Sequence, residues 1–269
     1  MICNIKDLNL NYEIIGDGIP ILMLHGFFAD SNLMSGCMEP ILIDNKNYKR
    51  IYLDLPGMGE SIGGEWIKNS DEILEIVLEF IEKIIPNEEI LLVGESYGGY
   101  ISLGLLHKIA SKVKGLLLIC PCVIAPMEKR NLPEHVILEC DKSLTSKLSA
   151  RDLHKFNERV VVQTSKTWER FKNEVLYGIK ICNRELLKNI KENGYEFSFD
   201  AINLKEKFTK PTTMLLGRQD SIVGYKDAFE MLDNFPRATF AVIDKAGHNL
   251  QFEQEEIFNT MVKDWLAKF

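Results

Sequence analysis

The chain has 269 residues, of which 46% are hydrophobic and 26% charged, a composition typical of a globular protein and not of a disordered or fibrous one. A folded chain of this length buries roughly 75% of the surface that its unfolded form exposes, so it can form a large hydrophobic core. It is therefore not one of the small scaffolds that lack such a core. Lys plus Arg number 32 against 39 for Asp plus Glu, a formal net charge of −7 with no long basic block, so nucleic acid is not an expected partner.

The first half of the chain alternates short apolar runs with amphipathic segments. One helix is expected over 71–85, where apolar residues recur at helical spacing between the possible cap Ser70 and the stop at Pro86. Such alternation is typical of an α/β fold, in which helices cover both faces of a mostly parallel sheet. The predicted strands are Leu8–Ile15, Ile19–Leu24, Arg50–Leu55, Ile90–Val93 and Gly115–Cys120.

The pattern changes after Pro121. From about Glu128 to Lys207 we find helical stripes, such as Leu153/Phe156/Val160, and no convincing strand. Strand character returns later, and a final amphipathic helix follows. We therefore predict a helical cap inserted into an α/β core. The ranges are 1–121 and 209–269 for the core, 122–208 for the cap, 212–216 and 239–243 for the two late strands, and about 255–269 for the last helix.

The six cysteines and the N-terminus indicate a compartment. The cysteines lie far apart except for the pair Cys120 and Cys122, whose spacing does not fit a metal or dithiol motif, so reduced thiols and no bound metal are expected. Met1–Leu10 is too polar for a secretory signal, and no run of about 18 apolar residues occurs. We expect a cytoplasmic protein with no membrane partner.

The segment Gly94-Glu95-Ser96-Tyr97-Gly98-Gly99 joins the predicted strand Ile90–Val93 to Tyr100–Ile109, which has helical composition. A serine on a sharp turn between strand and helix needs small neighbours, because the two backbones crowd together there. The helix N-terminus behind such a serine offers free N–H groups and a positive dipole end to a developing oxyanion. This setting predicts that Ser96 is a nucleophile.

A serine hydroxyl needs a base, and the base needs a carboxylate to fix its tautomer. His248 follows the last predicted strand on a glycine-containing loop, and Asp220 follows the run ending at Leu216. Both loops should reach the carboxyl edge of the sheet, where open α/β sheets place their sites. Asp244 is closer to His248 in sequence but lies at the end of a strand, so Asp220 is preferred as the acid. We predict Ser96, Asp220 and His248 as catalytic residues.

With these motifs the sequence resembles the α/β-hydrolase superfamily over almost its whole length, and within it the small capped serine hydrolases that include esterases, carbon–carbon-bond hydrolases and proline iminopeptidases. The motifs that carry the resemblance are His25-Gly26-Phe27-Phe28, Asp54-Leu55-Pro56-Gly57-Met58-Gly59-Glu60-Ser61, the turn around Ser96, Gly217 to Asp220, and Gly247-His248.

The resemblance implies roles for further residues. The N–H groups of Phe27 and Tyr97 would form the oxyanion hole, and the insert would be the cap that covers the pocket. We expect Phe28, Trp168 and Leu250 to contact the substrate, and we expect no cofactor. Epoxide hydrolases and haloalkane dehalogenases carry an aspartate nucleophile, so Ser96 argues against those activities. His25 and Asp54 are expected to be structural, and Glu95 is assigned no role.

Three functions are compatible with these residues. The leading hypothesis is a carboxylesterase-like serine hydrolase acting on a small apolar acyl substrate through an acyl-enzyme. The second is a carbon–carbon-bond hydrolase or lyase that uses the same three residues and would need an Arg for its anionic substrate, with Arg151, Arg159 and Arg170 in the predicted cap as candidates. The third is a non-catalytic small-molecule receptor on the same fold.

Overall fold

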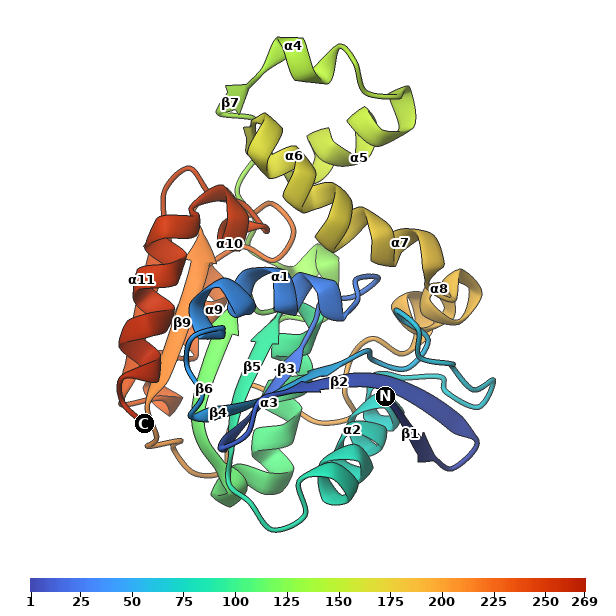
Figure 1. Cartoon of the computed structure of the whole chain (residues 1–269), viewed down its shortest axis with the longest axis vertical. Helices are drawn as coiled ribbons and strands as arrows, with labels where there is room; N and C mark the ends of the chain where they lie inside the picture. The colour runs from blue at the N-terminus through green and yellow to red at the C-terminus, as the bar shows by residue number, and fades with distance from the viewer.

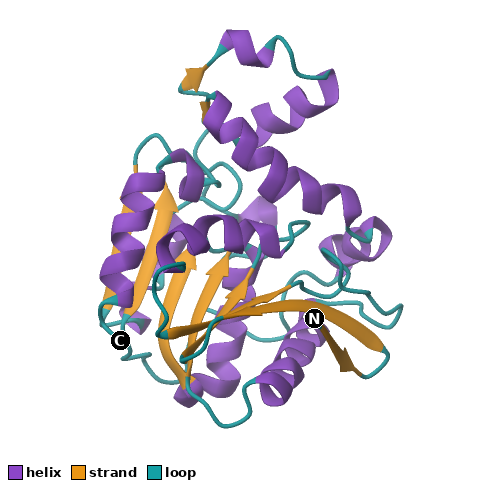
Figure 2. Ribbon diagram, viewed as in Figure 1, coloured by secondary structure: helices purple, strands orange, loops and turns teal.

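The computed structural model describes all 269 residues. An eight-stranded sheet lies between two helical layers, and a group of helices from the middle of the chain lies beyond the carboxyl edge of its strands (Figures 1 and 2). The predicted α/β fold class is confirmed. None of the helices has the length and apolar character needed to cross a lipid bilayer.

The sheet has the order β1-β2-β4-β3-β5-β6-β9-β10, and all pairs are parallel except β1 with β2 and β2 with β4. Central strands such as β3 and β5 are continuous apolar runs because helices cover both of their faces. The short edge strand β1, whose side chains alternate between exposed and buried, was not predicted. The bounds are β1 Ile2–Ile5, β2 Leu8–Ile15, β3 Ile19–Leu24, β4 Tyr48–Leu53, β5 Ile90–Glu95, β6 Val113–Ile119, β9 Thr212–Gly217 and β10 Ala238–Ile243.

Helices α2 and α3 contact each other on one face of the sheet, and α1 and α11 contact each other on the opposite face (Figure 1). The predicted helix over 71–85 is α2, but its cap is Asn69, whose side chain accepts from the N–H of Glu72. Ser70 points inward and donates to the carbonyl of Tyr195. The bounds are α1 Ser31–Leu42, α2 Ser70–Ile84, α3 Tyr97–Ile109, α9 Lys226–Glu230, α10 Leu250–Glu253 and α11 Glu255–Leu266, with 3-10 turns at Ala110–Lys112, Met127–Lys129 and Leu232–Asn234.

The segment 122–208 contributes most of the helices above the sheet. It also contains two strands of two residues each, β7 and β8, which pair in parallel, so the prediction that this segment has no strand was wrong. A two-residue strand is too short to produce a hydrophobic period. The bounds are β7 Glu139–Cys140, α4 Lys142–Thr145, α5 Ala150–Arg159, β8 Val162–Gln163, α6 Ser165–Phe171, a π-helical turn Lys172–Leu176, α7 Tyr177–Ile181 and α8 Arg184–Asn193.

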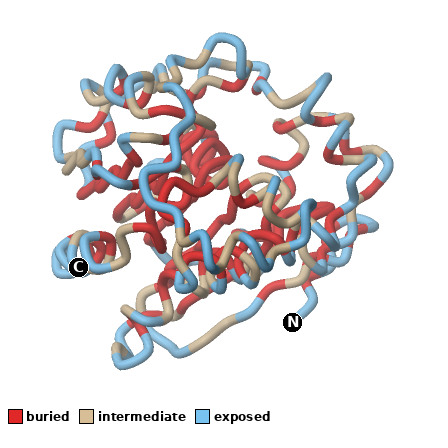
Figure 3. The backbone as a smooth tube through the Cα atoms, turned by 90° about the horizontal axis from the view of Figure 1, so that it is seen from above, coloured by how far each residue is buried: buried red, intermediate tan, exposed pale blue.

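Two hydrophobic clusters hold these parts together. The larger has 66 buried residues around the sheet, and Figure 3 shows the buried backbone concentrated there. The smaller has 9 and joins aromatic residues of the insert, among them Phe156 and Phe171, to Leu33 and Phe252 of the α/β part. The insert is therefore packed onto the sheet domain and not merely tethered to it.

Candidate active site

Ser96 occupies the single residue between the end of β5 and the start of α3, with φ 51° and ψ −113°. This backbone conformation is strained for a residue with a side chain and persists only where the surroundings impose it. A Cβ on Gly98 would lie 2.1 Å from the carbonyl oxygen of Leu24, and one on Gly94 would lie 2.5 Å from the carbonyl oxygen of Gly98. The glycines thus allow the close crossing of strand and helix that presents Ser96 to the cavity described below.

His248 and Asp220 reach Ser96 from the loops after β10 and β9. His248 Nε2 lies 2.9 Å from Ser96 Oγ, and His248 Nδ1 lies 2.9 Å from Asp220 Oδ2. The other carboxylate oxygen, Asp220 Oδ1, accepts from the N–H groups of Ile222 and Val223. Residues that are 28 and 152 positions from His248 in the sequence are therefore joined in one hydrogen-bonded chain.

The surroundings of Asp220 fix the state of His248. Burial by itself would raise the pKa of Asp220, yet the His248 ring and the two backbone donors hold that pKa below its ordinary value. An ionised carboxylate only accepts, so Nδ1 of His248 carries the proton and Nε2 is left to accept from the Ser96 hydroxyl. Burial would lower the pKa of His248, but Asp220 and Glu95 together raise it. This arrangement can take a proton from the Ser96 hydroxyl.

The other acidic and histidine candidates, Asp244 and His25, form hydrogen bonds away from Ser96. Asp244 is exposed and accepts from Gln219 Nε2 at 2.9 Å, away from His248. His25 accepts from the N–H of Leu55 through Nε2, so its Nδ1 carries the proton and donates to the carbonyl of Gly26. Burial lowers the pKa of His25, and this neutral ring ties the turn after β3 to the turn after β4.

Asp54 is also engaged in loop structure. Its Oδ1 accepts from the N–H of Ser31 at 2.7 Å, and its Oδ2 accepts from the N–H of Glu60 and from Asn11 Nδ2, each at 2.9 Å. These contacts connect α1, β2 and the loop after β4, and none of them reaches Ser96.

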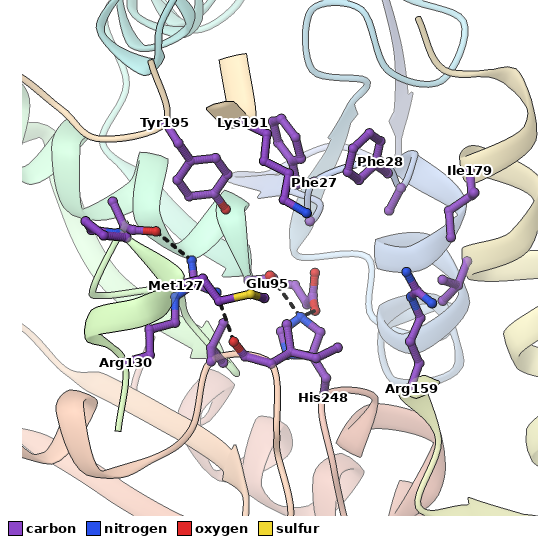
Figure 4. Close-up of a pocket in the computed structure, with 18 of the residues that line it drawn as sticks. Phe27, Phe28, Glu95, Met127, Arg130, Arg159, Ile179, Lys191, Tyr195 and His248 are labelled. Carbon is purple, nitrogen blue, oxygen red and sulfur yellow. Dashed lines mark hydrogen bonds and ion pairs between the residues drawn. The ribbon is translucent and has the colours of Figure 1, made fainter. Parts of the chain in front are cut away.

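The cavity around Ser96 has a volume of about 630 Å³ and is lined by residues of both the sheet domain and the insert (Figure 4). Phe27, Phe28 and Ser96 line it from the sheet domain, while Ile179 and Tyr195 come from the 122–208 segment. Phe28 is a predicted substrate contact, whereas Met127, Ile179 and Tyr195 are not, because an apolar residue in a helix or loop carries no mark of which cavity it faces.

Two residues predicted to contact the substrate do not line this cavity. Trp168 packs its ring edge-on against Phe156, with centroids 5.2 Å apart, inside the smaller hydrophobic cluster. Leu250 is fully buried in the main core. Each of these side chains is used in packing.

Phe27 lies in the turn after β3, and Tyr97 lies at the start of α3, directly after Ser96. Tyr97 is the first residue of α3, so its N–H has no partner within the helix. The Tyr97 side chain turns away from the cavity, and its hydroxyl shares a 2.8 Å hydrogen bond with Ser70 Oγ. The Phe27 ring lies edge-on to the Tyr97 ring at 4.9 Å. That the two N–H groups form an oxyanion hole stays a prediction.

One group of side chains has the composition of a metal site. Ligand atoms of Cys120, Asp220 and His248 lie within 4.8 Å of one another. Asp220 and His248 already bond to each other, and burial raises the pKa of the Cys120 thiol well above its ordinary value. Because metals bind the thiolate, the geometry favours the hydrogen-bonded chain over a metal centre.

Comparison with known proteins places this chain in a family. The family described as alpha/beta hydrolase fold matches residues 19–255. The chain belongs to this family. The resemblance deduced from the motifs is thereby confirmed, and the family supports hydrolase activity.

The chain is similar to curated proteins over nearly its full length. A pimeloyl-[acyl-carrier protein] methyl ester esterase of Shewanella woodyi is 25% identical, and the match covers 97% of this chain and 99% of the relative. A 2-hydroxy-6-oxononadienedioate/2-hydroxy-6-oxononatrienedioate hydrolase of Dechloromonas aromatica is 23% identical, with 97% of this chain and 91% of the relative covered. Among solved structures, an alpha/beta superfamily hydrolase of Oenococcus oeni is 27% identical with a TM-score of 0.88, and the match covers 96% of each chain.

Proposed function

We propose that this protein is a serine hydrolase that cleaves a small ester or related acyl compound through an acyl-enzyme. The observation that carries the proposal is the chain of two 2.9 Å contacts from Ser96 Oγ through the His248 ring to Asp220. A hydroxyl, an imidazole and a buried carboxylate in this order are the groups that convert an unreactive alcohol into a nucleophile.

In the proposed reaction Ser96 Oγ attacks the substrate carbonyl while His248 Nε2 takes the hydroxyl proton. Asp220 orients the ring and stabilises the imidazolium. The N–H groups of Phe27 and Tyr97 stabilise the oxyanion. His248 then gives its proton to the leaving alcohol, and the acyl group stays on Ser96. Water, deprotonated by His248, attacks the acyl-enzyme and releases the acid, after which Ser96 regains its proton.

The lining of the cavity supports an apolar acyl substrate. Phe27, Phe28, Val175 and Ile179 place aromatic and aliphatic surface next to Ser96. The volume of about 630 Å³ lies within the range of small-molecule sites. Esterases among the similar proteins, such as the one from Shewanella woodyi, act on an acyl ester according to their names.

Labelling by a fluorophosphonate probe tests the proposal, because the probe reacts only with an activated serine. The wild-type protein should be labelled and Ser96→Ala should not. Ser221→Ala is the matched control: its hydroxyl contacts His135 and does not line the cavity, so this variant should be labelled as the wild type is. Labelling that persists in Ser96→Ala would reject Ser96 as the nucleophile.

A second candidate function is carbon–carbon-bond hydrolysis of an anionic substrate by the same residues. Arg159 lines the cavity and provides a cation, whereas Arg151 and Arg170 do not line it. The similar protein from Dechloromonas aromatica is named as a hydrolase of dienedioate compounds. Turnover of a ring-fission dienone that exceeds turnover of nitrophenyl esters, and that falls in Arg159→Ala, would favour this candidate over the esterase.

A further inference from the structure

Glu95 lies beside the proposed nucleophile and faces the same nitrogen. It is the last residue of β5 and only 3% exposed. Its Oε1 lies 3.4 Å from His248 Nε2, the atom that also contacts Ser96 Oγ at 2.9 Å. Figure 4 shows the carboxylate directed at the His248 ring. Two oxygens of adjacent residues therefore contact the same imidazole nitrogen.

No lysine or arginine lies within ion-pair distance of the Glu95 carboxylate. The guanidinium of Arg130, which also lines the cavity, donates to the carbonyl oxygens of Ile124, Ala125 and Ile222 instead. The titratable groups near Glu95 are His248, which favours its ionised form, and Asp220, which disfavours it. The buried thiols of Cys37 and Cys120 are also near, and the Glu95 charge helps to raise the pKa of each. His248 is thus the only cation that this buried carboxylate can pair with.

The backbone holds Glu95 in this position. A Cβ on Gly26 would lie 2.2 Å from Glu95 Oε2, so the carboxylate rests directly on the turn that follows β3. The Gly26 N–H favours the ionised carboxylate. Because any side chain at Gly26 would displace the carboxylate, the contact between Glu95 and His248 is built into the loop that also carries Phe27.

We propose that Glu95 is a positioning residue that acts through His248, and that the two residues exchange protons as a coupled pair at the nitrogen that serves Ser96. The inference rests on the proposed function of His248 as the base for Ser96. It extends that function by adding a fourth side chain to the Ser96, His248 and Asp220 set.

The two protonation states of Glu95 have opposite effects on Ser96. A protonated Glu95 can donate its O–H to Nε2, where it competes with the Ser96 hydroxyl for the same lone pair. An ionised Glu95 leaves the lone pair to Ser96 and then stabilises the imidazolium once Nε2 has taken the proton. Burial raises the pKa of Glu95 to about 7, so it and His248 titrate in the same pH range.

The rate of fluorophosphonate inactivation between about pH 5 and 9 measures this coupling. In the wild type the acidic limb should require two ionisations. In Glu95→Gln it should require one, with the midpoint lower by about one pH unit because the negative charge beside His248 is gone. Glu95→Asp should lie between the two, since it keeps the charge at a greater distance. Asp244→Asn, an exposed carboxylate that does not contact His248, should keep the wild-type profile.

Side-chain NMR of His248 provides a readout that needs no activity. The His248 ring nitrogens should titrate at a lower pH in Glu95→Gln than in the wild type, with an unchanged thermal midpoint showing that the fold is intact. If Glu95→Gln does not fold, the titration of the Glu95 carboxyl carbon in the wild type decides: two steps shared with His248 support the proposal, and independent single steps overturn it.

The two proposals fail in different ways. If the wild-type protein is labelled at Ser96 but Glu95→Gln keeps the wild-type pH profile and His248 titration, the role of Glu95 is wrong and the serine hydrolase proposal stands. If Ser96 is not labelled while the His248 titration still shifts in Glu95→Gln, the serine hydrolase proposal is wrong and the coupled pair stands.

Discussion

Glu253 Oε2 accepts a 2.6 Å hydrogen bond from the backbone N–H of Gly247, the residue immediately before His248. Its Oε1 accepts from the N–H groups of Val161 at 2.6 Å and Val162 at 3.3 Å, where β8 of the insert begins. The carboxylate is buried. One side chain therefore holds the loop of His248 and the insert in a fixed relation to each other.

Glu253→Gln should destabilise the protein although Gln has the same shape. An amide has one acceptor oxygen, so its NH₂ group must face a backbone N–H on one of the two sides. A buried donor left without an acceptor costs about 1–3 kcal/mol, and we expect the free energy of unfolding to fall by that amount. The His248 loop should loosen as well, lowering the fluorophosphonate labelling rate several-fold.

Urea denaturation and labelling kinetics check this expectation. Glu256→Gln is the matched control, because Glu256 lies in the same helical region but its side chain is exposed. Wild-type stability in Glu253→Gln would show that the three backbone contacts do not hold the two parts together.

Asp220→Asn should abolish most of the activity with little change in structure. An Asn amide can donate to Nδ1 of His248, which stabilises the tautomer with its proton on Nε2. That tautomer cannot accept from the Ser96 hydroxyl, and in an analogous serine protease the equivalent change lowers kcat by about 10⁴-fold. We expect a loss of kcat/KM of that order on a nitrophenyl ester. Asp244→Asn should keep wild-type kinetics, and a loss of under about tenfold in Asp220→Asn would contradict the role of Asp220.

The sheet could be predicted because its chemistry is local. Runs such as Ile19–Leu24 and Ile90–Val93 are apolar throughout, which parallel strands covered on both faces require, and both appear as strands in the structure. Ser96, Asp220 and His248 could be brought together by the same logic, because each follows a strand at the carboxyl edge of one parallel sheet.

The contents of the cavity could not be predicted in this way. Helical periodicity can mark the apolar side of a segment such as that of Trp168, but it does not say what that side faces. In the structure the Trp168 side chain packs on Phe156. Tyr195 lies in a loop with no period, yet it lines the cavity. The importance of Glu95 depends on a 3.4 Å contact with a residue more than half the chain away, which no local pattern contains.

Arg170 is the main ionic link between the insert and the sheet domain. Its guanidinium contacts Glu174 one helical turn away, Glu255 Oε1 at 2.6 Å and the carbonyl oxygen of Gly36 at 3.0 Å. Burial raises the pKa of Glu174 although Arg170 lowers it. Glu174 is thus a buried acid that depends on Arg170 for its charge.

Arg170→Met should lower the free energy of unfolding by about 3–5 kcal/mol, because Glu174 is left buried without a partner. The double variant Arg170→Met/Glu174→Leu should recover most of that loss, since both charges are then absent. Urea denaturation measures the stability of each variant. Lys172→Met is the control, because Lys172 is an exposed cation on the same segment and pairs only with the exposed Glu169. A double variant no more stable than the single one would show that the unpaired Glu174 is not the cause.

Asp30 caps α1, but its surroundings disfavour the ionised form of its carboxyl group. Its Oδ1 accepts from the N–H of Asn32 at 2.9 Å, whereas its Oδ2 is buried without a hydrogen-bond partner. Burial raises the pKa of Asp30 to about 6, and the nearby carboxylates of Asp54 and Glu60 add to the effect. The folded protein therefore holds this proton more tightly than the unfolded chain does.

The sign of the pH dependence follows from that raised pKa. Between about pH 4 and 6 the unfolded chain releases the Asp30 proton first, so the contribution of Asp30 to stability falls as pH rises through this window. Asp30→Asn keeps the capping oxygen without the charge, and we expect it to match the wild type near pH 4 and to exceed it by about 2 kcal/mol at pH 8 in urea denaturation. Asp141→Asn is the opposite case, because hydrogen bonds from Ser143 and Leu144 lower the pKa of the exposed Asp141. This variant should therefore be no more stable than the wild type at pH 8. If Asp30→Asn is no more stable than the wild type at pH 8, the charge of Asp30 does not destabilise the folded protein.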